Sequence, residues 1–193
     1  MLIERITGVF TFREGVYADV EHDESFTNTA WLVVVGAAFL GQLGSVASTE
    51  GIGISWIIAS IVGTVFAVAA FALSTWVIQA VGKALYSAEV NFGELVRTLG
   101  LAYVWQALGV FGIVNASQSI ALSCLLAPLS FAIFILGLIA MFRAARVALD
   151  LDTTQTLVTV FLGWLVIVVF SVVITAILAF MGLVAAGAAG LLG

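Results

Sequence analysis

The sequence predicts an all-α fold: a polytopic membrane protein built as a bundle of five transmembrane helices, with a short N-terminal amphipathic segment at the membrane surface. Composition is the first reason, because hydrophobic residue types make up 63% of the 193 residues and charged types only 9%. Soluble domains are about 45–50% apolar and about 25% charged. A soluble fold of this size would lack the polar surface needed to cover so much apolar material.

The spacing of the charged residues is the second reason. Uncharged stretches of 25, 32 and 45 residues lie between charged residues after Glu24, and a further 41 uncharged residues follow Asp152. A helix needs about 20 predominantly apolar residues to cross a bilayer, so the first, second and last stretches hold one span each. A polar cluster at 115–119 divides the 45-residue stretch into two spans. The expected spans, which form one transmembrane domain over 27–193, are 27–46, 54–80, 95–114, 122–142 and 156–182.

Residues 1–26 form the expected N-terminal cytoplasmic segment, which is amphipathic at its start and acidic at its end. The apolar residues at its start recur at helical spacing: Leu2, Ile3, Ile6, Val9 and Phe10. Because such spacing places apolar side chains on one face of a helix, the pattern predicts a short helix lying on the membrane surface.

The basic residues predict the orientation of the chain in the membrane. Arg5 and Arg13 precede the first span, and Lys83 follows the second. Arg97 lies at the start of the third span, and Arg143 and Arg146 follow the fourth. All six therefore fall on one side of the membrane. Cytoplasmic loops carry an excess of Lys and Arg. We therefore expect an integral membrane protein with its N-terminus in the cytoplasm and its C-terminus outside, as five crossings require.

Charge and residue types argue against several classes of function. The net charge is −5, whereas a nucleic-acid-binding protein presents a basic face, so no nucleic-acid partner is expected. The predicted membrane interior holds no Asp, Glu or His, and the single histidine, His22, precedes the first span. The single cysteine, Cys124, lies in an apolar run that predicts a small core residue. We expect no catalytic residue, no metal site and no cofactor.

Two sets of residues are candidate contact surfaces. The first joins an acidic run before the first span to the basic turn that ends the fourth: Asp19, Glu21, Asp23, Glu24, Arg143 and Arg146. This set forms either an interaction face for a cytoplasmic partner or a solvated collar. The second set recurs every four residues in the second span: Ser55, Ala59, Gly63 and Ala67. Small residues at this spacing let another helix approach closely, either within the monomer or in self-association.

Three segments of the chain carry a family resemblance. They are the amphipathic lead-in MLIERITGVFTFREGVYADV, the Phe-Gly turn in NFGELVRTLGLAY at 91–103, and the basic, alanine-rich helix end in FRAARVALDLDTTQTLVTVFLGW at 142–164. Together with five expected crossings, they resemble the Yip family of membrane proteins, which carry a Yip-one domain. The match is to the short prokaryotic type, which implies the cytoplasmic membrane of a bacterium or archaeon.

The expected function is that of a non-enzymatic multi-pass membrane protein. It would act through protein–protein contacts in the membrane and at its cytoplasmic face, in a scaffold, assembly or membrane-organisation role, with the lipid bilayer as its surroundings. Two alternatives remain open. One is a passive channel or transporter for a small neutral solute, its path lined by Gln42, Gln106, Ser74 and Thr75. The other is an accessory subunit of a larger membrane complex.

Overall fold

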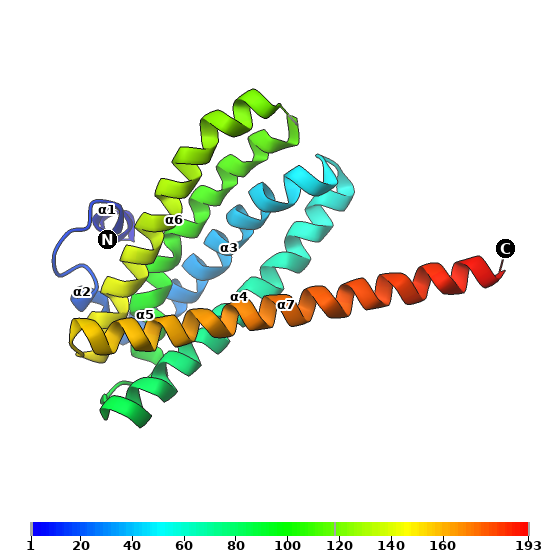
Figure 1. The fold of residues 1–193 in the computed structure, drawn as a ribbon. Helices are drawn as coiled ribbons and strands as arrows, with labels where there is room; N and C mark the ends of the chain where they lie inside the picture. Colours follow the sequence, from blue (N-terminus) through cyan, green and yellow to red (C-terminus); the bar gives the residue numbers. More distant parts are fainter. Residues whose placement is uncertain (1, 118, 193) are drawn as a thin grey trace.

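The computed structural model describes residues 2–117 and 119–192, with side chains included except at 48–50, 115, 178 and 182–192. This part of the chain folds into helices joined by short turns (Figure 1). The elements are α1 (Leu2–Phe10), α2 (Ala18–Glu21), η1 (Glu24–Phe26), α3 (Thr27–Glu50), α4 (Ile54–Tyr86), α5 (Phe92–Ala102), η2 (Tyr103–Ser117), α6 (Ile120–Leu149) and α7 (Thr153–Leu192). The all-α class predicted from composition is confirmed.

Five stretches of helix are long and apolar enough to cross a membrane, as predicted. They cover Glu24–Ala47, Ile54–Tyr86, Phe92–Val114, Ile120–Leu149 and Thr153–Met181. The third stretch joins α5 to η2, whose turns are wound more tightly than those of an α-helix. Its start is set locally, because Asn91 and Glu94 form a reciprocal capping box at the N-terminus of α5.

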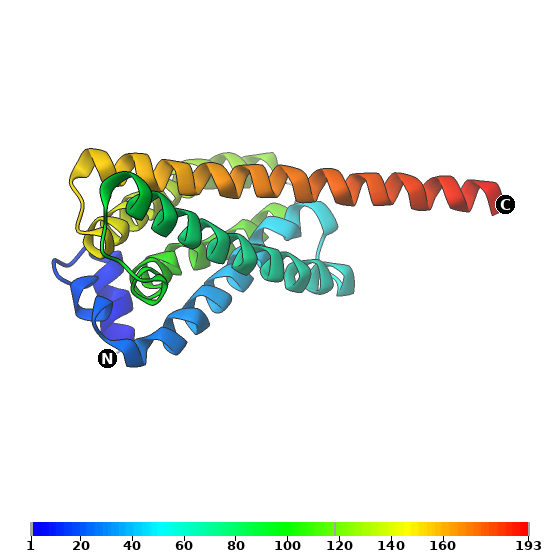
Figure 2. The ribbon, with the colours of Figure 1, turned by 90° about the horizontal axis from the view of Figure 1, so that it is seen from below.

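The helices pack as a loose bundle in which α3 contacts η2 and α4, α5 contacts α6, and α4 contacts α7 (Figures 1 and 2). Both views show the C-terminal part of α7 running beyond the other helices. Most fully buried apolar side chains gather instead where α1, α2, α5 and the end of α6 meet. The chain therefore builds its own core mainly at one end, and its long apolar helices are otherwise left to lipid.

The closest helix approach brings α3 against η2. A Cβ atom added at Gly44 would lie 1.8 Å from the carbonyl oxygen of Gly109, and one added at Gly109 would lie 3.1 Å from Cα of Gly41. Glycine at these positions lets the two backbones touch, which is how closely packed membrane helices gain van der Waals contact. The small-residue contact that organises the monomer is therefore a glycine pair on α3 facing another on η2.

The predicted small-residue stripe on α4 is only partly engaged in the monomer. A Cβ added at Gly63 would lie 2.5 Å from Oε1 of Gln42, so this glycine admits the α3 side chain. Ala59 and Ala67 are half-buried, whereas Ser55 is exposed. Packing within the monomer accounts for the middle of the stripe, and self-association through it stays a prediction.

Cys124 corrects an expectation about the core. We predicted a small core residue, yet the side chain is exposed on the outer surface of α6. Leu125 and Phe131 on the same helix are also exposed, at 72% and 67%. Lipid tails are as apolar as leucine, so an apolar run in a spanning helix does not have to face a protein core.

Candidate functional site

One end of the bundle collects the polar groups of the chain. It is formed by α1 and α2, by the turn between α4 and α5, and by the end of α6 (Figures 1 and 2). All six basic residues lie in or next to these parts of the chain, with Lys83 in the last turn of α4 and Arg97 in the first half of α5. We call this region the polar end. The turns between α3 and α4 and between η2 and α6 lie at the opposite end of the bundle.

Helix α1 forms as predicted, but much of its apolar face packs against the bundle. Val9 is fully buried, whereas Ile3 is 81% exposed. The ring of Phe10 meets that of Trp105 edge-on with centroids 4.9 Å apart, and Phe12 stacks on Trp105 at 5.8 Å. These aromatic contacts hold α1 against the middle of the third span, where η2 begins. Only the first residues of the predicted surface helix thus remain available to lipid.

Arg97 ties α2 to the bundle. Its side chain is 5% exposed, and its Nε donates to the carbonyl oxygens of Val20 at 3.1 Å and Glu21 at 2.9 Å. Nη2 also donates to the Glu21 oxygen, and Nη1 donates to the hydroxyl of Thr27 at 3.2 Å. Carbonyl groups at the end of a helix attract cations, so the buried guanidinium is held without a carboxylate at these contacts.

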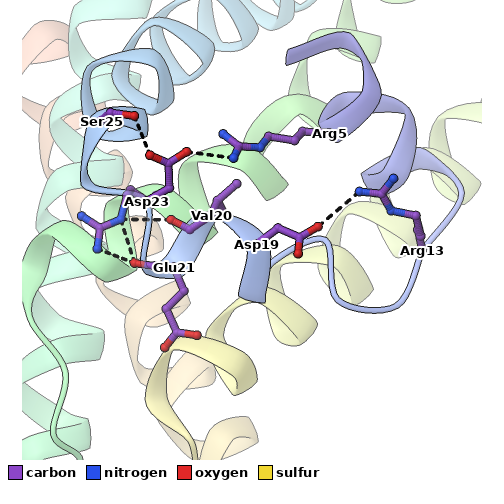
Figure 3. A network of polar contacts seen from close by, with 8 residues as sticks. Arg5, Arg13, Asp19, Val20, Glu21, Asp23 and Ser25 are labelled. Carbon is purple, nitrogen blue, oxygen red and sulfur yellow. Dashed lines mark hydrogen bonds and ion pairs between the residues drawn. The ribbon is translucent and has the colours of Figure 1, made fainter. Parts of the chain in front are cut away.

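The carboxylates of the predicted acidic run make different contacts in the structure. Arg5 Nη2 donates to Asp23 Oδ2 at 2.8 Å, and Arg13 Nη2 lies 3.4 Å from Asp19 Oδ2 (Figure 3). These two carboxylates therefore hold α1 and the loop that follows it. Glu24 is exposed.

Glu21 is placed apart from the other acidic residues. Its carboxylate points away from the Arg5–Asp23 pair and toward the end of α6 (Figure 3). Burial, with the nearby negative charges of Glu94 and Asp150, raises the pKa of this carboxyl above its usual range, against the opposing effects of His22 and Arg97. The acidic run is thus not one continuous face.

A cleft of about 1110 Å³ opens where Glu21 points. Its walls come from the loop after α1, from the turn between α4 and α5, and from the last two turns of α6. The charged residues that line it are Arg13, Glu14, Glu21, Glu89, Arg143, Arg146 and Asp150, and His22 lines it as well. Three members of the predicted interaction set, Glu21, Arg143 and Arg146, therefore share one cavity. We call it the polar-end cleft.

The two α6 arginines in this cleft keep most of their hydrogen-bonding capacity. Arg143 donates to the Phe12 carbonyl at 3.4 Å, and its guanidinium carbon lies 5.1 Å from the Phe12 ring centroid. Arg146 is exposed, and the ion pairs among the described side chains involve neither arginine. Tyr17, another lining residue, is 5% exposed, and its buried hydroxyl has no hydrogen-bond partner among the described residues.

Two smaller hollows lie among the spanning helices. Gln42 lines both, and Gln106 lines the one of about 340 Å³ between α3, α4 and η2. Neither hollow is lined by Ser74 or Thr75. Ser74 instead donates to the Gly163 carbonyl of α7 at 3.1 Å, and Thr75 is buried. The structure therefore brings only two of the four predicted path residues together.

Sequence reasoning placed Arg97 on this side of the membrane but missed its burial, and it did not single out Tyr17. Arg97 was counted only as a basic residue, although it falls inside the predicted span 95–114, where an unpaired cation is costly and needs a partner. A cation inside a predicted span therefore indicated that Arg97 is buried and hydrogen-bonded to another part of the chain. Tyr17 offered no such signal, since its burial depends on α6.

Comparisons with known proteins found that no protein-family model, no curated protein and no solved structure matches the chain. Within the described residues, no group of three or more His, Cys, Asp or Glu side chains is arranged to hold a metal ion. The polar-end cleft is therefore interpreted from its own residues.

Acidification is expected to loosen α1 before it affects the spans. The Ser25 hydroxyl and the Arg5 guanidinium, which both donate to Asp23, hold the pKa of that carboxyl below its usual range. A lowered folded-state pKa contributes stability above the usual aspartate pKa of about 3.9, and this stability is lost as pH falls through the folded-state value. The measurement is the hydrogen-exchange protection factor of α1 amides, followed from pH 7 downward.

Two variants make this test specific. Asp23→Asn should show the reduced protection of α1 already at pH 7, whereas Glu24→Gln, which alters an exposed neighbouring carboxylate, should keep the protection of the unchanged protein. Equal protection in the two variants would mean that the Arg5–Asp23 pair does not hold α1.

Proposed function

We propose that this chain is a non-enzymatic multi-pass membrane protein that works by binding at its polar end, in a scaffold, assembly or membrane-organisation role. The polar end faces the cytoplasm, because all six basic residues lie there and cytoplasmic segments are enriched in Lys and Arg. The N-terminus is then inside and the C-terminus outside. The proposed location is the cytoplasmic membrane of a bacterium or archaeon.

The polar-end cleft is the observation that carries this proposal. It is large enough for a ligand or a partner segment, and it places exposed charges of both signs beside apolar and aromatic walls. The bundle beneath it is held by Arg97 and by the Trp105 contacts, so the walls come from packed elements. A preorganised cavity of this kind lowers the entropic cost of binding.

The resemblance to the Yip family supports the same proposal. The segment 91–103 begins α5 through its capping box, and the segment 142–164 contains Arg143 and Arg146, which line the cleft. Membership of that family stays a prediction, since it depends on these loosely patterned segments. The passive-path alternative draws support from Gln42 and Gln106, which share one hollow at membrane depth.

Site-specific photo-crosslinking in living cells tests binding at the cleft. A photoreactive amino acid is placed at Glu14 or Glu89, which are exposed and line the cleft from two different loops. The matched control is Glu4, which is exposed at the same end of the molecule but does not line the cleft. We expect light-dependent adducts at both cleft positions and few at the control.

The mass of the adduct shows what binds. Protein-sized adducts would support a scaffold or an accessory subunit of a larger complex, and lipid-sized adducts would support a lipid ligand. Adducts that are absent from Glu14 and Glu89, or equally abundant at Glu4, would contradict the proposal that the cleft is the working surface.

A further inference from the structure

Charges of opposite sign are separated along the C-terminal end of α6 and the residue that follows it. Arg143 and Arg146 are three residues apart, so their side chains leave α6 on the same side, and Asp150 directly follows the last residue of the helix with a left-handed backbone. All three line the polar-end cleft. A helix rises 1.5 Å per residue, so Arg146 lies about 4.5 Å and Arg143 about 9 Å before the last residue of α6, and Asp150 lies beyond that residue. The cleft is therefore positive near the membrane and negative farther out.

The outer part of the cleft holds carboxylates that form no ion pair with the described side chains. Glu21 points toward the end of α6 (Figure 3), and the negative charge of Asp150 is close enough to act on it. Glu89 lines the same cavity from the turn between α4 and α5. None of the three forms an ion pair among the described side chains. A bound cation would relieve the repulsion between these groups.

The inner, positive part holds donors that suit a phosphate. Arg143 and Arg146 have no carboxylate partner among the described side chains, and guanidinium groups bind phosphate oxygens in a two-pronged geometry. Tyr17 lines the same cleft as the two arginines, and its buried hydroxyl has no partner in the described structure, so it is a further donor available there. A free anion alone would not suit the cleft, because its outer carboxylates would repel it.

Apolar surface continues from the positive pole into the membrane. Ile139 lies one turn before Arg143 on the same side of α6 and is 39% exposed, and Ile135, a turn earlier, is 37% exposed. A ligand with acyl chains can therefore place them along α6 while its polar part enters the cleft. In a phospholipid the phosphate lies nearer the acyl chains and the headgroup amine lies farther out, which matches the order of charges in the cleft.

We propose that the polar-end cleft binds a zwitterionic headgroup that joins a phosphate to a primary amine, with the phosphate at Arg143 and Arg146 and the ammonium at Glu21 and Asp150. The chemistry is that of phosphatidylethanolamine or of its soluble headgroup ester. This inference rests on the proposed function, since it names the ligand class of the same cleft. A primary ammonium donates hydrogen bonds to carboxylates, which the quaternary amine of phosphatidylcholine cannot do.

The test measures lipid retention by the full chain. The protein in mild detergent is mixed with phosphatidylethanolamine, phosphatidylcholine or phosphatidylglycerol of matched acyl chains, and bound lipid is counted by native mass spectrometry. We expect one phosphatidylethanolamine to bind about tenfold more tightly than the other two, as the loss of one charge-assisted hydrogen bond predicts. Competition by soluble glycerophosphoethanolamine shows whether the headgroup alone suffices; no competition assigns the site to the membrane lipid.

Three variants separate the two poles. Arg146→Ala should weaken retention of phosphatidylethanolamine and phosphatidylglycerol alike, whereas Asp150→Asn should remove the preference for phosphatidylethanolamine over phosphatidylglycerol. Glu24→Gln is the control, since Glu24 is exposed and does not line the cleft. Unchanged thermal unfolding midpoints show that the variants fold.

Equal retention of the three lipids by the unchanged protein, or a preference that survives Asp150→Asn, would overturn this inference. Protein-sized crosslinks at Glu14 and Glu89 without any lipid preference would overturn it while leaving the proposed function in place. The absence of both crosslinks and lipid preference would overturn the two together.

Discussion

Replacing Arg97 with methionine is expected to release α2 from the bundle while the five spans stay inserted. The guanidinium is buried and donates to the carbonyl oxygens of Val20 and Glu21 and to the hydroxyl of Thr27. Hydrogen bonds to a charged group contribute about 1.5–3 kcal/mol each, and the carbonyls left behind would lose their partner. We expect a cost of about 3–5 kcal/mol for docking of α2.

Hydrogen exchange over residues 2–26 measures this release. Arg146→Met is the matched control, because it removes an exposed arginine without an ion-pair partner in the described structure and is expected to change stability by no more than about 0.5 kcal/mol. Arg97→Lys should restore only part of the protection, since a lysine ammonium lacks the planar fork of donors. Full protection of α2 in the Arg97→Met protein would show that the aromatic contacts of Trp105 suffice.

Release of α2 would also change the polar-end cleft. Tyr17 and Glu21 form part of its wall, and both reach that position only when α2 is docked. The Arg97→Met protein should therefore lose its preference for phosphatidylethanolamine together with the protection of α2. Retention of the preference after α2 has been released would place the ligand elsewhere.

Replacing Gly44 with alanine is expected to force α3 and η2 apart. The added Cβ would lie 1.8 Å from the carbonyl oxygen of Gly109 and 3.2 Å from the backbone nitrogen of Gly112. Backbone atoms cannot rotate away as a flexible side chain can, so the two helices must separate and lose their contact. Overpacking of this kind costs about 1–3 kcal/mol, and a clash with backbone lies at the upper end of that range.

Gly36→Ala is the control for this change, because it places the same methyl group on the same helix with nothing within 4 Å. Alanine is a better helix former than glycine, so this variant should be neutral or slightly more stable. The measurement is the thermal unfolding midpoint of each variant in one detergent. Equal midpoints for the Gly44 and Gly36 variants would show that the close approach of α3 and η2 contributes little.

The sequence by itself determined the number of spans, the class of fold and the collection of cations at one end. These features depend on local properties of the sequence, because a helix that crosses the bilayer must be apolar along its own length. The start of α5 is local in the same sense, since Asn91 caps a residue only three positions away. Such features do not need a neighbouring helix.

Only the tertiary structure decided which faces meet. The acidic run was read as one surface, yet Asp19 and Asp23 pair with arginines of the N-terminal segment while Glu21 turns toward α6. The small-residue contact lies between Gly44 and Gly109 as well as on the predicted stripe of α4. In lipid, an apolar side chain is stable against either a neighbour or an acyl chain, so hydrophobic pattern does not mark the packed face. Arg97 lies more than 70 positions along the chain from its partners Val20 and Glu21, so these contacts form only once the helices have packed.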